Sequence, residues 1–126
     1  PLRRVADWDT VKGFASTLAH GLAEEAPDRF VAKMSKSRRK GRIFVDWLRN
    51  ERGSTAVCPY SLRARPGGPV AVPVTWDQLA DLEGPDVFRM GDMADRLSSP
   101  CPYAELANDL QSITKDAVER LEGWYG

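Results

Sequence analysis

Apolar and polar residues follow a helical period over the first part of the chain. Between residues 8 and 26, apolar side chains recur three and four positions apart, which places them on one helix face. This face consists of Val11, Phe14, Ala15, Leu18 and Leu22. Asp7 suits the N-cap and Pro27 stops the pattern. We therefore predict a helix over residues 8–26, with His20 on its opposite, polar face and exposed to solvent.

Shorter apolar runs follow, and they have the character of strands. Residues 29–34 and 41–48 are separated by the basic stretch "KSRRKG", which we interpret as a hairpin-like connection closed by Gly41. The stretch "PVAVPVTW" alternates as a strand does, but Pro69 and Pro73 confine it to a sheet edge or an extended segment.

The remaining part of the chain predicts short elements and one longer helix. Thr75 can cap a helix over residues 76–82, and we expect a strand over 86–90 and a helical turn over 91–97. A helix from about 103 to 122 is predicted by an apolar stripe formed by Leu106, Leu110, Ile113, Ala117 and Leu121. The predicted order is α-β-β-loop-β-α-β-α, so the expected fold class is α/β or α+β.

Size and composition indicate one globular domain. The chain has 126 residues, of which 42% are hydrophobic and 29% charged. The sequence contains neither a long apolar stretch nor a secretory signal, so we expect a cytoplasmic, nucleoid-associated protein with no membrane partner.

Cys58 and Cys101 have no CxxC partner and no neighbouring histidine pair, which favours two idle thiols over a zinc site.

Charge is unevenly distributed although the formal net charge is zero. Residues 33–65 contain ten basic and two acidic side chains, a local net charge of +8, whereas residues 75–126 contain four basic and eleven acidic ones, a local net charge of −7. This asymmetry is typical of polyanion binding. Mutual neutralisation of the two segments across the fold explains it equally well.

An aspartate follows the apolar run Ile43–Val45. An unpaired carboxylate at the end of a buried strand is costly, so Asp46 needs a positive neighbour. Arg42 or Arg49 could supply it as a structural ion pair, and a divalent metal could supply it as part of a functional site. The residues alone leave both alternatives open.

Two longer stretches carry a resemblance to a known family. "MSKSRRKGRIFVDWLRN", followed by "GSTAVCPYSLRARPGGPVAVPVTWDQL", resembles the polymerase domain of bacterial ligase D, the DNA ligase of non-homologous end joining. That domain belongs to the archaeo-eukaryotic primase superfamily. The resemblance runs from Pro1 to about Leu82. We place the C-terminal portion of a primase-polymerase-like domain, with a mixed or antiparallel sheet flanked by helices, at residues 1–97, and a helical extension at 98–126.

The resemblance implies roles for individual residues. Asp46 matches the family's third metal-binding aspartate, which makes it the candidate catalytic and metal residue, with Mn²⁺ or Mg²⁺ as the cofactor of a complete domain. Arg49 and Arg63 match basic residues that face the phosphates of the incoming nucleoside triphosphate. The implied partners are DNA ends, nucleoside triphosphates and the remaining parts of a ligase complex. From their place on the basic connection, Lys36, Arg38, Arg39 and Lys40 are candidate contacts to the DNA backbone.

The chain also departs from the family pattern. Neither a DxD pair on an apolar strand nor the Ser/Lys/His triphosphate motif is present, and "DWD" at residues 7–9 stands where helix-capping residues are expected. We therefore expect part of a DNA-repair nucleotidyltransferase that is inactive alone. The alternative is a non-catalytic accessory module or relic that binds the DNA backbone.

Overall fold

The computed structural model describes residues 1–125, Ala107 by its backbone alone. The chain divides into two compact units. The first, here the terminal unit, comprises Leu2–Thr55 and Gln111–Gly126; the second, the central unit, comprises Pro1 and Ala56–Leu110. In the part of the chain that the structure describes, no helix is both long and apolar enough to cross a membrane.

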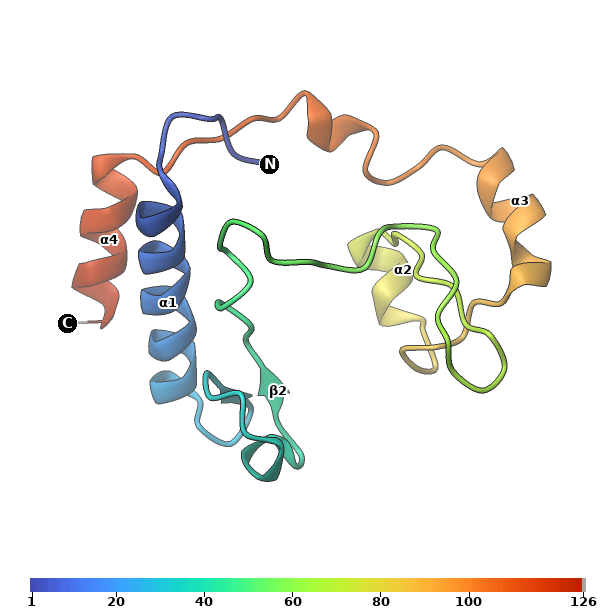
Figure 1. Cartoon of the computed structure of the whole chain (residues 1–126), viewed down its shortest axis with the longest axis horizontal. Coiled ribbons are helices and arrows are strands. Elements are labelled where there is room, and N and C mark those ends of the chain that lie inside the picture. Colours follow the sequence, from blue (N-terminus) through green and yellow to red (C-terminus); the bar gives the residue numbers. More distant parts are fainter. Residues whose placement is uncertain (126) are drawn as a thin grey trace. The chain divides into compact units, whose positions relative to one another are not determined.

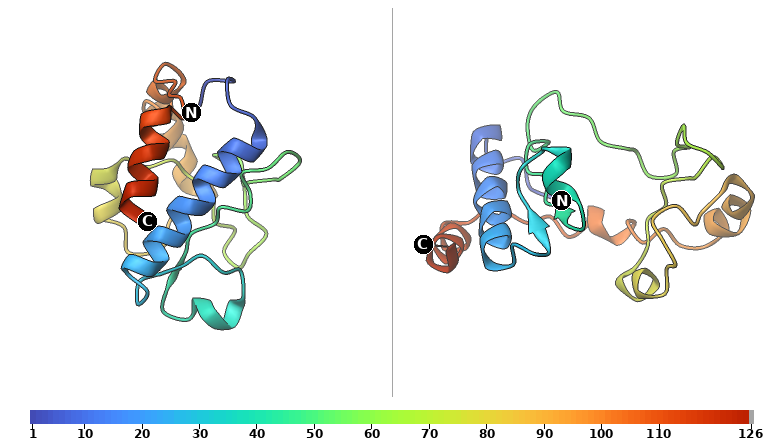
Figure 2. Two further views of the ribbon diagram at one scale, coloured as in Figure 1. Left: turned by 90° about the vertical axis from the view of Figure 1, so that its left-hand side faces the viewer. Right: turned by 90° about the horizontal axis from the view of Figure 1, so that it is seen from below.

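Helix α1 (Trp8–Glu25) confirms the helix predicted over residues 8–26, and it forms the middle of the terminal unit. An Asp7 carboxylate oxygen accepts the Thr10 N–H at 2.8 Å, and the chain leaves the helix at Ala26, just before Pro27. Helix α4 (Lys115–Tyr125) lies along one side of α1, and the strands lie on the other side (Figures 1 and 2). An isolated parallel β-bridge between Leu2 and Gln111 connects the two sequence segments of this unit.

Close packing between α1 and α4 depends on a glycine. A Cβ atom placed on Gly21 would lie 2.5 Å from Trp124 Cζ3, so any side chain there would displace the indole. The hydroxyl group of Tyr125 donates a hydrogen bond to Glu24 at 3.0 Å. Ala19 of α1 and Leu121 of α4 are among the buried core residues of the unit.

The two strands pair in parallel, which corrects the predicted hairpin. Strand β1 (Phe30–Val31) and strand β2 (Ile43–Phe44) are two residues each, with Phe30 opposite Ile43. Parallel strands require a crossover rather than a tight turn. The basic stretch provides part of that crossover as a 3₁₀ helix, η1 (Lys36–Arg39), and Gly41, with φ of 73°, turns the chain into β2.

The central unit contains short helices and extended chain. Helix α2 (Trp76–Ala80) begins with a capping box between Thr75 and Gln78. The 3₁₀ helix η2 (Met90–Asp92) leads into α3 (Met93–Ser98), and a last 3₁₀ helix, η3, spans Glu105–Ala107. These elements agree with the predicted helix near 76–82 and the predicted helical turn near 91–97.

The two strands predicted for this unit are present only as isolated bridges. Val70 pairs with Leu62, and Pro69 pairs with Arg89. Proline cannot donate a ladder hydrogen bond, so Pro69 and Pro73 limit the length of regular pairing in this segment.

The predicted helix over residues 103–122 is wrong, because the segment contains two separate helices. η3 ends at Ala107, and α4 starts only at Lys115, where the Thr114 hydroxyl accepts the Ala117 N–H at 3.1 Å. The apolar stripe is therefore divided: Leu106 and Leu110 are exposed in the central unit, while Leu121 is buried in the terminal unit. The predicted domain boundary after residue 97 stays a prediction.

Candidate functional site

Asp46 follows the last hydrogen bond of the small sheet, which the Val45 N–H donates to the Val31 carbonyl at 3.0 Å. Its carboxylate oxygen Oδ2 lies 3.3 Å from Nε of Arg49. The Asp46 side chain is 27% exposed and that of Arg49 is 67% exposed. Of the two arginines considered from the sequence, Arg49 is thus the observed partner, whereas Arg42 donates to the Pro27 carbonyl.

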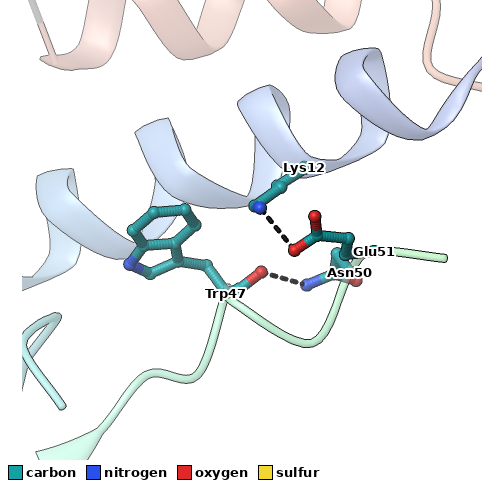
Figure 3. A network of polar contacts seen from close by, with 4 residues as sticks. All are labelled: Lys12, Trp47, Asn50 and Glu51. Carbon is teal, nitrogen blue, oxygen red and sulfur yellow. Dashed lines mark hydrogen bonds and ion pairs between the residues drawn. The ribbon is translucent and has the colours of Figure 1, made fainter. Parts of the chain in front are cut away.

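The turn after Asp46 is anchored to the rest of the terminal unit. The indole N–H of Trp47 donates to the Ala32 carbonyl at 3.2 Å, and the Asn50 amide donates to the Trp47 carbonyl at 3.1 Å. Lys12 of α1 forms an ion pair with Glu51 at 2.5 Å (Figure 3). These contacts hold the segment that carries Asp46 and Arg49 beside α1.

His20 also belongs to this anchor, which corrects the expectation that it is solvated. Its ring centroid lies 5.7 Å from that of Trp47, and Nδ1 lies 2.8 Å from the Ser16 carbonyl. A carbonyl only accepts, so Nδ1 carries a proton in this contact. Helical spacing puts His20 away from the apolar stripe, but Trp47, in the turn that follows β2, packs against this face of α1 as well.

The four candidate DNA contacts do not share one environment. Lys36, Arg38 and Lys40 are exposed on or next to η1. Arg39 is half-buried: Nη2 donates to the Met34 carbonyl at 2.6 Å, and its guanidinium carbon lies 4.0 Å from the Phe44 ring centroid. Three side chains are therefore free to meet a phosphate backbone, while Arg39 packs on β2.

Arg63 lies in the central unit, where its N–H donates to the Pro69 carbonyl at 2.8 Å. Together with Arg65 it lines a cavity of about 420 Å³, whose walls include apolar residues such as Val70 and the ring of Tyr103. The structure brings Asp46 and Arg49 together within one unit. Convergence of Arg63 on them stays a prediction.

The described residues do not by themselves form a metal site. Nowhere in residues 1–125 do three or more histidine, cysteine, aspartate or glutamate side chains gather in a group that could hold an ion. The "DWD" stretch is used as a helix cap: the hydrogen bonds from Thr10 lower the pKa of Asp7 and hold it at the start of α1. Asp46 alone does not fit a divalent ion, which takes several oxygen ligands.

One polar contact in the central unit was not anticipated from the sequence. A hydrogen bond from the Tyr60 hydroxyl lowers the pKa of the Cys101 thiol, and backbone hydrogen bonds from Tyr103 and Ala104 add to this effect. The reciprocal contact raises the pKa of Tyr60. Both cysteines are free. Motifs based on the spacing of nearby residues, such as CxxC, could not find this pair, because Tyr60 and Cys101 are distant in the sequence.

Comparison with known proteins decides the family. The sequence-family model of the LigD primase-polymerase domain matches residues 1–102 of this chain. The chain belongs to the LigD primase-polymerase family. The resemblance drawn from the quoted stretches is thereby confirmed, together with the mixed α+β fold class.

Curated LigD relatives support this assignment. The multifunctional non-homologous end joining protein LigD of Pseudomonas aeruginosa is 41% identical over 117 residues, which cover 90% of this chain and 14% of the relative. LigD of Mycolicibacterium smegmatis is 41% identical over 98 residues, covering 78% of this chain and 12% of that protein. A match over 90% of the chain exceeds residues 1–102, so LigD similarity continues into the C-terminal segment.

A solved LigD structure has the same fold. The polymerase domain of ligase D from Mycobacterium tuberculosis, determined in complex with DNA, matches with a TM-score of 0.75 and 29% identity. The match covers 88% of this chain and 39% of that domain. The chain thus spans less than half of the solved LigD polymerase domain and a small fraction of the full-length LigD proteins.

Proposed function

We propose that this chain supplies one part of a LigD-type nucleotidyltransferase site that extends or fills DNA ends before they are joined in the bacterial nucleoid. The observation that carries the proposal is the half-buried Asp46 at the end of β2, paired with an exposed Arg49, in a chain of the LigD primase-polymerase family. Asp46 would be one ligand of a Mg²⁺ or Mn²⁺ ion. The other ligands would come from a different polypeptide segment.

Arg49 is suited to hold a nucleoside triphosphate while it stays beside Asp46. Only its Nε atom is recorded in the ion pair with Asp46, and the guanidinium carries further N–H donors on its two Nη atoms. A guanidinium fork matches the spacing of phosphate oxygens. Arg63, which lines the cavity of the central unit, would contact phosphate in the same way.

DNA binding would come from Lys36, Arg38 and Lys40. These side chains are exposed around one short 3₁₀ helix, so they can reach neighbouring phosphates. Contacts of this kind hold the DNA without reading its sequence. Neutralising three phosphates predicts that log K falls against log salt with a slope of roughly −3 on duplex DNA.

A salt titration of duplex DNA binding tests this proposal. The variant carries alanine at Lys36, Arg38 and Lys40, and the matched control carries alanine at three exposed basic residues elsewhere in the same unit, Arg4, Lys33 and Arg52. Both variants lose three charges, so only the location differs. We expect a slope close to zero for the variant and the wild-type slope for the control. Equal slopes in the wild type and the variant would contradict the assignment.

A second candidate function is a non-catalytic module that binds the DNA backbone. It is favoured by the neutralisation of Asp46 by Arg49 and by the absence of a metal-binding group among residues 1–125. An NMR titration distinguishes the two functions. Shifts of Arg49 and Arg63 resonances on addition of a nucleoside triphosphate support the nucleotidyltransferase site. Shifts confined to η1 on addition of DNA, with no response to nucleotide, support the binding module.

A further inference from the structure

The turn after β2 meets helix α1 at two separate points. The ring centroid of Trp47 lies 5.7 Å from that of His20. Further along the turn, Oε2 of Glu51 lies 2.5 Å from Nζ of Lys12 (Figure 3). His20 and Lys12 are about 12 Å apart along the helix axis, more than two helical turns. Arg49 stands between Trp47 and Glu51 in the chain, so the segment that carries it is attached to α1 on both sides.

The ion pair between Lys12 and Glu51 is a tertiary contact. In the part of the chain that the structure describes, the other recorded ion pairs join residues three or four positions apart. The side chain of Lys12 is 29% exposed and that of Glu51 is 53% exposed, so the pair is partly shielded from solvent. Lys12 therefore connects the turn to a helix, which a local ion pair cannot do.

Glu51 makes the last attachment of the turn to α1 before the chain leaves the terminal unit at Thr55. Residues 52–59 are all exposed, and among the described residues no hydrogen bond or ion pair is recorded between 52–55 and α1. The Ser54 N–H donates back to the Glu51 carbonyl at 3.2 Å. Without the contact to Lys12, the last attached residue would be Trp47, and Arg49 would belong to the exposed segment.

We propose that Lys12 is a positioning residue, which acts through Glu51 to hold Arg49 ready for a phosphate group. The ion pair of Arg49 with Asp46 does not fix the turn, because Arg49 is 67% exposed and exposed pairs are weak. Phosphate binding costs less free energy when the segment that carries the donor is already ordered. This inference rests on the proposed function, because it concerns the same Arg49.

Charge reversal of the pair tests the proposal in the full 126-residue chain. Lys12→Glu and Glu51→Lys each place like charges side by side and so detach the turn. The double variant restores an opposite pair with the wild-type net charge. NMR relaxation of the Arg49 backbone amide is measured without ligand. We expect an order parameter of about 0.85 in the wild type and the double variant, and below about 0.6 in either single variant.

Inorganic triphosphate is then titrated without metal, and its dissociation constant is measured from the Arg49 resonances. We expect each single variant to weaken binding about threefold, the size of effect that a partly exposed ion pair can have. The double variant should restore the wild-type dissociation constant. Direct attraction of phosphate by charge predicts a different result, in which Lys12→Glu weakens binding but Glu51→Lys strengthens it. The sign of the Glu51→Lys effect therefore separates positioning from attraction.

The matched control reverses an ion pair of the same residue types in the same unit. Lys115 and Glu119 of α4 lie 3.5 Å apart, and α4 packs on the side of α1 away from the strands. Reversal of this pair should change neither the order parameter of Arg49 nor the dissociation constant. Circular dichroism checks that each variant is folded. If Lys12→Glu is unfolded, Glu51→Lys and the double variant decide, because Glu51 is the more exposed partner.

Two results would overturn the proposal. The first is an Arg49 amide that stays rigid in the single variants, or that the double variant leaves mobile. The second is tighter binding of triphosphate by Glu51→Lys than by the wild type. If Arg49 in the wild type does not respond to triphosphate, the proposed function fails instead. The order parameters measured without ligand would then still decide whether Lys12 fixes the turn.

Discussion

Asp46 and Arg49 form an ion pair that is weak enough to be rearranged. Their atoms are 3.3 Å apart and Arg49 is mostly exposed, and exposed pairs contribute between zero and about 1 kcal/mol to stability. Trp47, by contrast, contacts both Ala32 and His20. The turn is therefore held by Trp47 and its neighbours, which leaves Arg49 free to bind a second anion.

Replacement of Trp47 tests this distribution of roles. Trp47→Phe keeps an aromatic ring but removes the indole donor to the Ala32 carbonyl, so the free energy of unfolding should fall by about 1 kcal/mol. Urea unfolding followed by circular dichroism measures it. Trp8→Phe, at an exposed tryptophan, is the control and should change little. A loss from Arg49→Ala larger than that from Trp47→Phe would show that the ion pair holds the turn.

The contact between Tyr60 and Cys101 predicts a pH-dependent reactivity. The Tyr60 hydroxyl stabilises the thiolate and so lowers the pKa of Cys101. Tyr60→Phe removes this donor and should raise the thiol pKa, moving the midpoint of the alkylation rate with iodoacetamide to higher pH. Peptide mass spectrometry separates the two cysteines, and Cys58 serves as the internal control. An unchanged midpoint at Cys101 would mean that the backbone donors act alone.

Packing between elements depends on a few positions where the helices approach most closely. Gly21 is one of them, since α4 places Trp124 over it. At the start of α4, the hydroxyl group of Thr114 accepts the Ala117 N–H. The C-terminal segment thus returns to the terminal unit and packs on α1, although part of it, η3, belongs to the central unit.

A pair of glycine substitutions in α1 tests this packing. Gly21→Ala should lower the free energy of unfolding by about 1–3 kcal/mol, because the new methyl group meets the Trp124 ring. Gly13→Ala is the matched control, as an added Cβ there meets nothing within 4 Å. It should raise stability by about 0.5–1 kcal/mol through helix propensity. Stabilisation by both changes, measured by urea unfolding, would show that α4 does not pack at Gly21.

At the scale of the whole molecule, the chain is a family member that contains only part of the family's domain. Its described residues place one candidate metal carboxylate at β2 and gather no set of three. Two divalent ions in nucleotidyl transfer need several converging carboxylates or phosphates. Activity is therefore expected to require carboxylates from outside residues 1–125.

The purified chain alone should not incorporate labelled nucleotide into a primer-template with a 5′ overhang, with either Mg²⁺ or Mn²⁺. The intact polymerase domain of the Pseudomonas aeruginosa relative is the positive control for the assay. Incorporation by the chain that disappears in Asp46→Ala would contradict the prediction, and would mean that its own residues complete the metal site.

Features that depend on neighbours within about four residues were predictable from the sequence. The Asp7 cap and Pro27 define α1, and Thr75 with Gln78 defines the start of α2, because these signals act on backbone groups close by. Membership of the LigD family and the position of Asp46 directly after an apolar strand were also predictable, because each depends on a contiguous stretch of the sequence.

Features that depend on distant residues were decided only by the tertiary structure. The basic stretch suits a hairpin tip locally, but pairing of Phe30 with Ile43 makes it a crossover. Arg39 is a basic residue like its neighbours, yet contact with Phe44 leaves it half-buried while they are exposed. The apolar stripe of residues 106–121 fits one helix, but only its second part, in α4, packs on α1. In each case a long-range contact selects between local conformations of similar free energy, and a local pattern carries no information about that contact.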